Sequence, residues 1–301
     1  MNIPHRDPRN KDCEKLADEA ASAIRKKLQI PQGETPRIGL ILGTGWGDTL
    51  AIETPAGRPK SIPFAEASEA FSTLQVLEGH ARKIAYGYVH LEGYRHVPVV
   101  LLRGRVHMNE TPGSISTLLQ VRLQVEMLIH LGVRRLILTC AAGGLKKEIQ
   151  KGDLIAIDGF FGELVPVKPL FAGEFATADK AIDRELMKLA LCAPPQCLPH
   201  RIFKGGHAIV RGPDFEGPYG KAFLAGIHPN LLSIGMSIIP EALIAELYHD
   251  DGVRVLPFAN ITDGVSDDCT HEGNQAAAKA VSAQLGSFLR YIIEAVNNEA
   301  S

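Results

Sequence analysis

The alternation of short apolar runs with helical segments along nearly the whole chain is the feature that most limits the fold. Residues 37–42, 135–140 and 253–261 are apolar runs typical of buried strands, and 116–131 has the apolar spacing of a helix. No linker or repeat interrupts this order. The sequence therefore predicts the α/β class, as a single domain over residues 1–301 with a mixed, largely parallel central sheet flanked by helices.

The remaining predicted elements continue the same order. We expect further strands at 83–91, 97–102, 153–158, 207–210 and 231–235. We expect further helices at 13–28, 178–191, 240–248 and 272–297. Proline and glycine indicate long loops at 164–176 and 192–204, and residues 1–12 are expected to form a flexible tail. Loops at strand ends are where such folds hold ligands.

The charge balance and the cysteines limit the partners and the compartment. Lys plus Arg number 32 and Asp plus Glu number 34, and the net charge of −2 gives no reason to expect a nucleic-acid or membrane partner. The five cysteines form no Cys-x-x-Cys pair, which disfavours a disulfide framework or a zinc site. The N-terminus lacks the apolar stretch of a signal peptide, and no apolar run approaches the ~20 residues that span a bilayer. We therefore expect a cytoplasmic protein.

Three segments place glycine, small or basic residues directly after an apolar run, where they suit an anion. The turn at 43–47 lets backbone N–H groups approach a ligand and adds the hydroxyl of Thr44. Arg105 and His107 are separated by one residue, so an extended chain would point both toward one anion. Residues 139–144 are small and expose backbone amides. Each segment taken alone is also typical of a tight turn, a solvated strand end or close packing.

A fourth group of residues suits a flat heteroaromatic ring. Phe215 can stack on such a ring, and Met236 offers an adaptable apolar wall. Glu216 and Asp263 can hydrogen-bond ring N–H or amino groups. Phe215 and Met236 are equally typical of a core, and Glu216 of a solvated surface. The histidines of interest are His80, His107 and His271.

Taken together and in this order, these segments resemble the trimeric class of purine nucleoside phosphorylases. No single segment is diagnostic, but the combination covers the chain from about residue 37 to 290. The matching stretches are GTGWG (43–47), GHARK (79–83), GRVHMNE (104–110), AAGGL (141–145), KGD (151–153), GPDFE (212–216), IGMSIIPEA (234–242) and ITD (261–263) with His271. The resemblance implies a nucleoside phosphorylase-like fold.

The resemblance also implies a role for each matching residue. The residues implied to hold phosphate are Thr44, His80, Arg105, His107, the backbone N–H of Ala141, and Ser237. Those implied to hold the nucleoside are Asn109, Ala142, Gly143, Phe215, Glu216, Met236, Asp263 and His271, the last on the ribose 5′ side. The implied catalytic residues are His107, Glu216 and Asp263.

The implied reaction is the phosphorolysis of a purine nucleoside. Phosphate itself attacks the anomeric carbon, the transition state is oxocarbenium-like, and a donor at N7 of the purine stabilises the departing base. No covalent nucleophile, metal or cofactor is implied, and inorganic phosphate is a co-substrate. The family forms trimers in which a neighbour's phenylalanine closes the sugar pocket. The candidates for that role are Phe160, Phe171 and Phe175.

Several positions depart from the family pattern, mostly on the nucleoside side. Asn109 stands where the family usually has tyrosine, Cys140 where it has asparagine, and Gly159 within its Asp-His-Ile segment. Residues 217–220 replace the usual Thr-x-Ala-Glu, and the loop from 263 to 271 is shorter than usual. These departures leave open a nucleoside- or phosphate-binding protein that has lost efficient catalysis.

The aspartate at position 263 leaves the preferred base open. Enzymes for 6-oxopurines carry asparagine there, whereas methylthioadenosine phosphorylase has aspartate. An ionised Asp263 accepts from a 6-amino group, which favours an adenine-type or 5′-modified nucleoside. Glu216 instead suits the N1–H of hypoxanthine or guanine, and a protonated Asp263 would restore a donor to N7. One hydrogen bond to a charged group contributes about 1.5–3 kcal/mol, so the two carboxylates act in opposite directions with similar strength.

Overall fold

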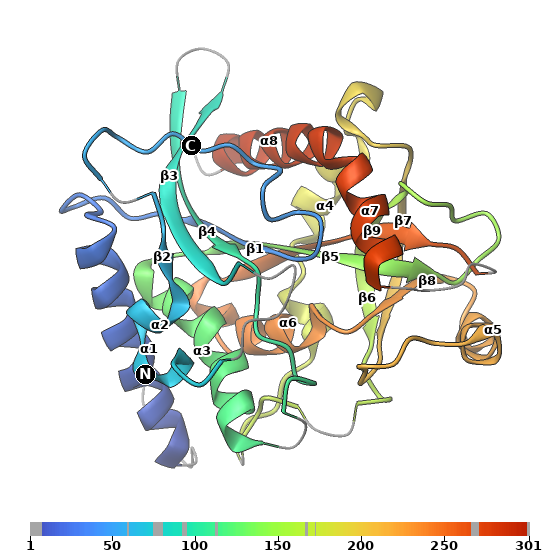
Figure 1. The fold of residues 1–301 in the computed structure, drawn as a ribbon, viewed down its shortest axis with the longest axis horizontal. Coiled ribbons are helices and arrows are strands. Elements are labelled where there is room, and N and C mark those ends of the chain that lie inside the picture. The colour runs from blue at the N-terminus through green and yellow to red at the C-terminus, as the bar shows by residue number, and fades with distance from the viewer. Residues whose placement is uncertain are drawn as a thin grey trace.

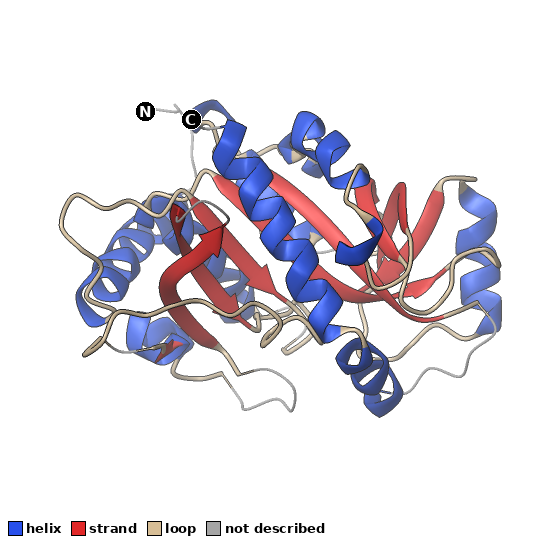
Figure 2. Ribbon diagram, turned by 90° about the horizontal axis from the view of Figure 1, so that it is seen from above, coloured by secondary structure: helices blue, strands red, loops and turns tan. Residues whose placement is uncertain are grey.

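The structure is a computed structural model of the chain, and its described residues are 8–58, 60–74, 81–91, 95–111, 114–165, 168–171, 173–265 and 271–299. All strands named within these ranges belong to one nine-stranded mixed sheet. Helices cover both faces of this sheet (Figures 1 and 2). The predicted α/β class is therefore confirmed.

The sheet closes on itself at one end. Its strand order is β2-β3-β4-β1-β5-β8-β7-β6-β9, and β9 also pairs with β5, so these last five strands form a ring. Strands β1, β4, β5 and β9 run parallel to one another, whereas β8 meets the end of β5 antiparallel. The strand bounds are β1 Ile38–Leu42, β2 Ile62–Pro63, β3 Lys83–Leu91, β4 Arg95–Arg103, β5 Arg135–Gly144, β6 Leu154–Phe161, β7 Ile202–Ile209, β8 Leu231–Gly235 and β9 Arg254–Asp263.

The helices form a layer on each side of the sheet. Helices α7 and α8 lie over one face, and α1, α3 and α6 lie over the other (Figures 1 and 2). None of the helices in the described part of the chain is long and apolar enough to cross a membrane. The helix bounds are α1 Pro8–Lys27, α2 Phe64–Ala67, α3 Ile115–Leu131, α4 Arg184–Leu191, α5 Pro218–Ile227, α6 Ile239–Glu246, α7 His271–Ala280 and α8 Ser282–Glu299. Short 3-10 turns occur at 69–71, 178–181, 195–197 and 249–251.

The burial of the central elements explains why these segments form strands and helices. Every residue of β1 is buried, as expected for a parallel strand covered by helices on both faces. Helix α8 buries Leu285, Phe288, Leu289 and Ile292, which recur at helical spacing on one side. Helix α3 ends at Gly132, whose φ of 118° is the left-handed conformation that closes many helices.

The structure corrects several predicted element boundaries. Residues 8–12 belong to α1 rather than to a tail, while residues 1–7 lie outside the described part. The helix predicted at 178–191 is broken, because Ile182 is extended and bridges to Val255, and Asp183 accepts from the backbone N–H of Leu186 as the cap of α4. The helix predicted at 272–297 is two helices, α7 and α8, and nothing in the structure explains the break at Val281.

Helix α5 was not predicted from the sequence. Its first residues, Gly217-Pro218-Tyr219-Gly220, have the composition of a turn. In the structure Gly217 precedes the helix and Pro218 is its first residue, a position where the missing N–H of proline is not needed. This helix brings Lys221 into the interior.

The glycine turn after β1 is held between β5 and α7. Gly43 approaches β5 so closely that a Cβ would lie 2.6 Å from the carbonyl oxygen of Thr139. Its N–H donates to the Thr139 hydroxyl at 3.2 Å, and the Trp46 indole donates to the carbonyl of Cys140 at 3.1 Å. Gly45 has a φ of 79°, and a Cβ there would overlap the Cβ of Ala278 on α7. The turn therefore requires glycine for both space and backbone conformation.

We expect Gly45→Ala to lower the free energy of unfolding by about 1–3 kcal/mol from backbone strain alone, with the overlap at Ala278 adding to it. The double variant Gly45→Ala/Ala278→Gly should recover only the part due to overlap. Gly47→Ala is the control, because no atom lies within 4 Å of a Cβ at Gly47. Urea unfolding measures all three variants, and a Gly45→Ala protein as stable as the wild type would contradict the packing described.

Candidate active site

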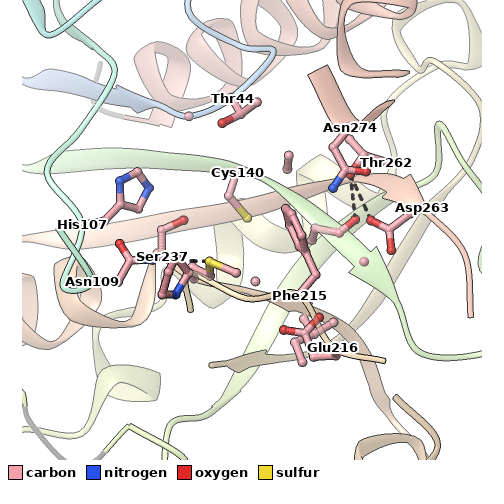
Figure 3. Close-up of a pocket in the computed structure, with 18 of the residues that line it drawn as sticks. Thr44, His107, Asn109, Cys140, Phe215, Glu216, Ser237, Thr262, Asp263 and Asn274 are labelled. Carbon is pink, nitrogen blue, oxygen red and sulfur yellow. Dashed lines mark hydrogen bonds between the residues drawn. The ribbon is translucent and has the colours of Figure 1, made fainter. Parts of the chain in front are cut away.

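A cavity of about 560 Å³ opens where the chain leaves the carboxyl ends of several strands. This volume lies within the range of small-molecule sites. Figure 3 shows Thr44, His107 and Ser237 toward one end, and Thr262, Asp263 and Asn274 toward the other. The first is called the oxyanion end, for its hydroxyl and imidazole donors, and the second the base end, for the carboxyl group that can bind a heteroaromatic base. The cavity is lined by Gly43, Thr44, Arg105, His107, Asn109, Glu110, Cys140, Ala141, Ala142, Gly143, Pro213, Phe215, Glu216, Ile234, Gly235, Met236, Ser237, Thr262, Asp263 and Asn274.

The structure brings together the predicted site residues that it describes. Thr44, Arg105, His107, Asn109, Ala141, Ala142, Gly143, Phe215, Glu216, Met236, Ser237 and Asp263 all line this cavity. His80 lies outside the described residues. His271 begins α7, but its side chain lies outside what the structure describes. The roles implied for these two histidines stay predictions.

Arg105 is buried beneath the oxyanion end of the cavity. Its Nη1 donates to the carboxylate of Glu241 at 2.6 Å, and both side chains are nearly inaccessible to solvent. Its Nη2 donates to the carbonyls of Ile41, at 3.2 Å, and Thr139. Both Arg105 and His107 line this cavity, and they follow the end of β4 at Arg103, but the Nη atoms of Arg105 bind Glu241, Ile41 and Thr139 in the protein interior. Arg105 supplies positive charge from below the cavity.

Glu110 orients His107 at the same end of the cavity. The Glu110 carboxylate accepts from the backbone N–H of His107 at 2.8 Å and lies 3.7 Å from Nδ1 of its ring. Its other oxygen accepts from Arg82 at 2.6 Å. Burial alone raises the pKa of Glu110, but the hydrogen bonds from His107 and the charge of Arg82 outweigh it and lower that pKa. The ionised carboxylate thus fixes the position of the imidazole.

A second buried side chain holds the backbone between Arg105 and His107. Gln124 on α3 accepts from the N–H of Val106 at 2.8 Å and donates to its carbonyl at 3.0 Å. Next to Ser237, at the same end of the cavity, Ile238 has a φ of 76°, which is uncommon for a β-branched residue. This conformation turns the chain between Ser237, which lines the cavity, and the start of α6. Strain of this kind gathers at functional sites.

His207 lies behind the oxyanion end. Its side chain is fully buried, its Nδ1 is 2.9 Å from the hydroxyl of Ser233, and its Cε1 would lie 3.1 Å from a Cβ at Gly235. Burial, and then the positive charge of Arg105, lower the pKa of His207 to about 3. The ring is therefore neutral at physiological pH. The sequence assigned no functional role to His207, and in the structure it is a core residue.

A buried ion pair lies at the base end of the cavity. Nζ of Lys221 donates to Oδ2 of Asp263 at 2.6 Å and to the carbonyl of Gly264 at 2.7 Å, and Lys221 is 1% exposed. The hydroxyl of Thr262 donates to Oδ1 of Asp263 at 3.3 Å (Figure 3). Gly143 leaves room for this carboxylate, because a Cβ there would lie 3.0 Å from Oδ2. Both oxygens of Asp263 thus accept hydrogen bonds from protein donors.

Glu216 differs from Asp263 in its electrostatic environment. Burial raises the pKa of Glu216 and outweighs the hydrogen bond from its own backbone N–H and the charge of Lys221, which both lower it, while Asp263 and Asp214 raise it by smaller amounts. The two carboxyl groups at the base end therefore differ: Asp263 is paired directly with Lys221, whereas the raised pKa of Glu216 makes its protonated form more accessible. Such a difference is how a site separates a hydrogen-bond donor from an acceptor.

The wall between the two ends is apolar and closely packed. The ring of Phe215 is 38% exposed and faces the cavity (Figure 3). The Asn109 amide lies 3.5 Å from the sulfur of Met236, and a Cβ at Gly212 would collide with both side chains. Cys140 is buried, and burial raises the pKa of its thiol to about 12, so it lines the cavity as a neutral group.

Five side chains important to this geometry were not assigned a role from the sequence. Glu110 follows His107 within a matching stretch, so its position was visible there but not its pairing. The partners of Arg105 and Asp263 lie far along the chain, and no local pattern indicates them. The five are Glu110, Gln124, Lys221, Glu241 and Asn274.

Comparisons with known proteins agree with this fold and cavity. A sequence model described as the phosphorylase superfamily matches residues 37–296. Purine nucleoside phosphorylase 1 of Bacillus subtilis is 32% identical over 256 residues, which cover 83% of this chain and 85% of that protein. The crystal structure of Schistosoma mansoni purine nucleoside phosphorylase in complex with inosine superposes with a TM-score of 0.74, at 26% identity over 93% of this chain and 96% of that one.

A further solved structure shows the same likeness. Isoform 2 of the Schistosoma mansoni enzyme, in complex with cytosine and ribose-1-phosphate, superposes with a TM-score of 0.73. The identity is 27%, and the alignment covers 93% of this chain and 95% of that one. The chain therefore belongs to the purine nucleoside phosphorylase family within the phosphorylase superfamily, which confirms the resemblance found in the sequence.

The lowered pKa of His207 predicts how stability depends on pH. Below about pH 6.5 the unfolded chain binds a proton at this histidine and the folded protein does not, so folding stability falls as pH falls toward 3. Over that window the wild type should lose about 1.4 kcal/mol per pH unit more than His207→Gln, which does not titrate. Urea unfolding between pH 7 and 4 measures this. A His207→Gln slope equal to that of the wild type would contradict the assignment.

Proposed function

We propose that this protein uses inorganic phosphate to split a purine (deoxy)ribonucleoside into free base and (deoxy)ribose 1-phosphate. The observation that carries this conclusion is one continuous cavity that joins an oxyanion end to a base end. Hydroxyl and imidazole groups line the first end, and two carboxyl groups with an aromatic ring line the second (Figure 3). A nucleoside and a phosphate ion require such a pair of adjacent subsites.

The oxyanion end suits phosphate through several donors of different kinds. The hydroxyls of Thr44 and Ser237, the imidazole of His107 and the backbone N–H of Ala141 would donate to its oxygens. Arg105 lies beneath them and offsets the charge of the ion, although Glu241 balances part of that effect. The predicted contribution of His80 would add to this set.

The reaction itself needs little chemistry from the protein. A phosphate oxygen forms a bond to the anomeric carbon as the C–N bond breaks, and the electron pair of that bond passes to the purine. The purine takes up one proton, which balances the proton that the hydrogen phosphate ion loses when it becomes the phosphate ester. The protein would position both reactants, with His107 on the phosphate, and a protonated Glu216 would donate a hydrogen bond to the departing base. This balance involves no redox partner, so we propose phosphate as co-substrate and no cofactor.

A 6-aminopurine nucleoside is a second candidate substrate, and the Lys221–Asp263 ion pair is the observation that favours it. An ionised Asp263 accepts from an amino group on C6 of the purine, and it repels a 6-oxo group. The raised pKa of Glu216 makes its protonated form more accessible, and that form donates to the unprotonated N1 of adenine. The two carboxyl groups then fit one base without conflict.

We further propose a cytoplasmic homotrimer. The cysteines that the structure describes, Cys13, Cys140, Cys192 and Cys197, are free thiols, which suits a reducing compartment. Of the three phenylalanines considered for a neighbour's pocket, Phe175 is 93% exposed, whereas Phe171 is buried beneath the guanidinium of Arg122. Phe175 is thus the one best placed to contact a second subunit.

The proposed reaction predicts base release that depends on phosphate. The purified protein should release free base from at least one of inosine, guanosine, adenosine and methylthioadenosine in phosphate buffer, and from none without phosphate or arsenate. Chromatography of the products measures this. If the protein bound a nucleoside but released no free base from any of the four, the proposed enzymatic activity would be refuted and a nucleoside-binding protein would be favoured.

The ion pair predicts a switch of base preference. In the wild type, kcat/KM for adenosine should exceed that for inosine. The double variant Lys221→Met/Asp263→Asn replaces the charged pair by a neutral amide that donates to a 6-oxo group, so the ratio should fall by at least about tenfold. The double variant is used because Lys221→Met alone leaves a buried charge unpaired, at a cost of about 3–5 kcal/mol of stability.

Lys146→Met is the matched control for this switch. Lys146 also supports α5, through the carbonyl of Ala225, but it lies outside the cavity, so the ratio should stay at the wild-type value. A wild type that prefers inosine, or a double variant whose ratio does not change, would refute the 6-amino preference and leave phosphorolysis intact.

A further inference from the structure

A cluster of two histidines and a glutamate lies outside the cavity, on the strands β3 and β4. His90 and His96 are direct partners in the antiparallel register of these strands. The third member, Glu53, is exposed like the two histidines. One ligand atom from each residue lies within 4.8 Å of the other two. Such a set of nitrogen and oxygen donors is the kind that binds divalent transition metals.

The backbone fixes the two histidines on one face of the sheet. Directly opposed residues of an antiparallel pair have Cβ atoms about 4.5–5.5 Å apart and point the same way. The two imidazole rings are accordingly 4.2 Å apart between centroids, with their planes at 71°. The His90 carbonyl also accepts from Arg290 on α8 at 3.3 Å, which fastens β3 to the helical layer. Ligands on paired strands lose little freedom when they bind an ion.

The third ligand is held in place by its own backbone. Glu53 and Tyr88 form an antiparallel bridge with two hydrogen bonds, of 2.8 and 2.9 Å. Gly87 permits this approach, because a Cβ there would lie 2.5 Å from the carbonyl oxygen of Glu53. The Glu53 carboxylate contacts Nε2 of His90. The glutamate therefore reaches the histidine pair from a separate, ordered segment.

We propose that Glu53, His90 and His96 form a binding site for a divalent transition metal, with zinc as the best fit. Tetrahedral zinc with bonds of about 2.0–2.1 Å places its ligand atoms about 3.4 Å apart, so a pair at the 4.8 Å limit would close by about 1.4 Å, while the direct contact between Glu53 and His90 would open to admit the ion. Two imidazoles favour zinc, nickel or copper over calcium or magnesium. A water molecule would take the fourth position, since all three residues are exposed. The ion would link the segment that contains Glu53, which follows the turn at 43–47, with strands β3 and β4.

The competing account is a plain ion pair between His90 and Glu53, with His96 only packed against it. The two accounts differ on His96, which the metal requires and the ion pair does not. They also predict different zinc stoichiometries, because only the metal site binds an additional equivalent of zinc. Neither account involves the cavity, so phosphorolysis is a check on folding and not the readout.

The test is a calorimetric titration of metal-free protein with Zn²⁺, for the wild type and for His96→Gln and Glu53→Gln. The wild type should bind one equivalent more than His96→Gln, or bind it at least about 100-fold more tightly, because even outer partners of metal ligands contribute 10–100-fold. Zinc should raise the melting temperature of the wild type by a few degrees more than that of either variant. His249→Gln is the matched control, since His249 is also exposed beside a carboxylate, Asp250 at 3.7 Å.

Cobalt distinguishes this site from the free thiols. Bound Co²⁺ should give the visible spectrum of a tetrahedral nitrogen and oxygen site, and that spectrum should disappear in His96→Gln. A thiolate charge-transfer band instead would assign the metal to Cys192 or Cys197, both of which are free and at least partly exposed. Equal stoichiometry and affinity in the wild type and His96→Gln would overturn the proposal.

Discussion

The buried ion pair between Arg105 and Glu241 is the interaction on which the oxyanion end of the site depends. The guanidinium joins the segment after β4 to α6 and also binds the carbonyls of Ile41, near the end of β1, and Thr139, in the middle of β5. A charge this deep is costly unless it is paired, and here two strands and a helix provide partners for its Nη1 and Nη2 atoms. Burial, and then the charge of the same guanidinium, lower the pKa of His207 and keep it neutral. The positive potential below the cavity is therefore a property of the fold and not of a mobile surface residue.

At the base end, the ammonium group of Lys221 distinguishes two carboxyl groups, because it binds Asp263 directly and not Glu216. From the sequence, Glu216 and Asp263 favour opposite bases with similar strength. The structure removes that symmetry, because Lys221 binds Asp263 directly while burial and the neighbouring carboxylates raise the pKa of Glu216. One group is then held as an acceptor and the other is closer to a donor. A protonated Asp263, which was one hypothesis from the sequence, would lose its strongest contact.

How much of the site was predictable depended on the distance between partners along the chain. The Gly43–Thr44–Gly45 turn and the residues around Ala141 follow apolar strands directly, so local pattern placed them at one edge of the sheet. Lys221 and Asp263 are 42 residues apart, and Arg105 and Glu241 are 136 apart, so no local pattern pairs them. Helix α5 was also hidden, because its proline and glycines have the composition of a turn.

The same limit explains why the histidine and glutamate cluster has no signature in the sequence. Metal motifs are recognised when ligands share a helix turn or a tight loop, because spacing then fixes their geometry. His90 and His96 are brought together by strand register, and Glu53 by a bridge to Tyr88. Register depends on the whole pattern of a strand and not on any one interval. In this chain the chemistry that arises from local turns was visible in the sequence, whereas the chemistry that arises from pairing between distant segments required the fold.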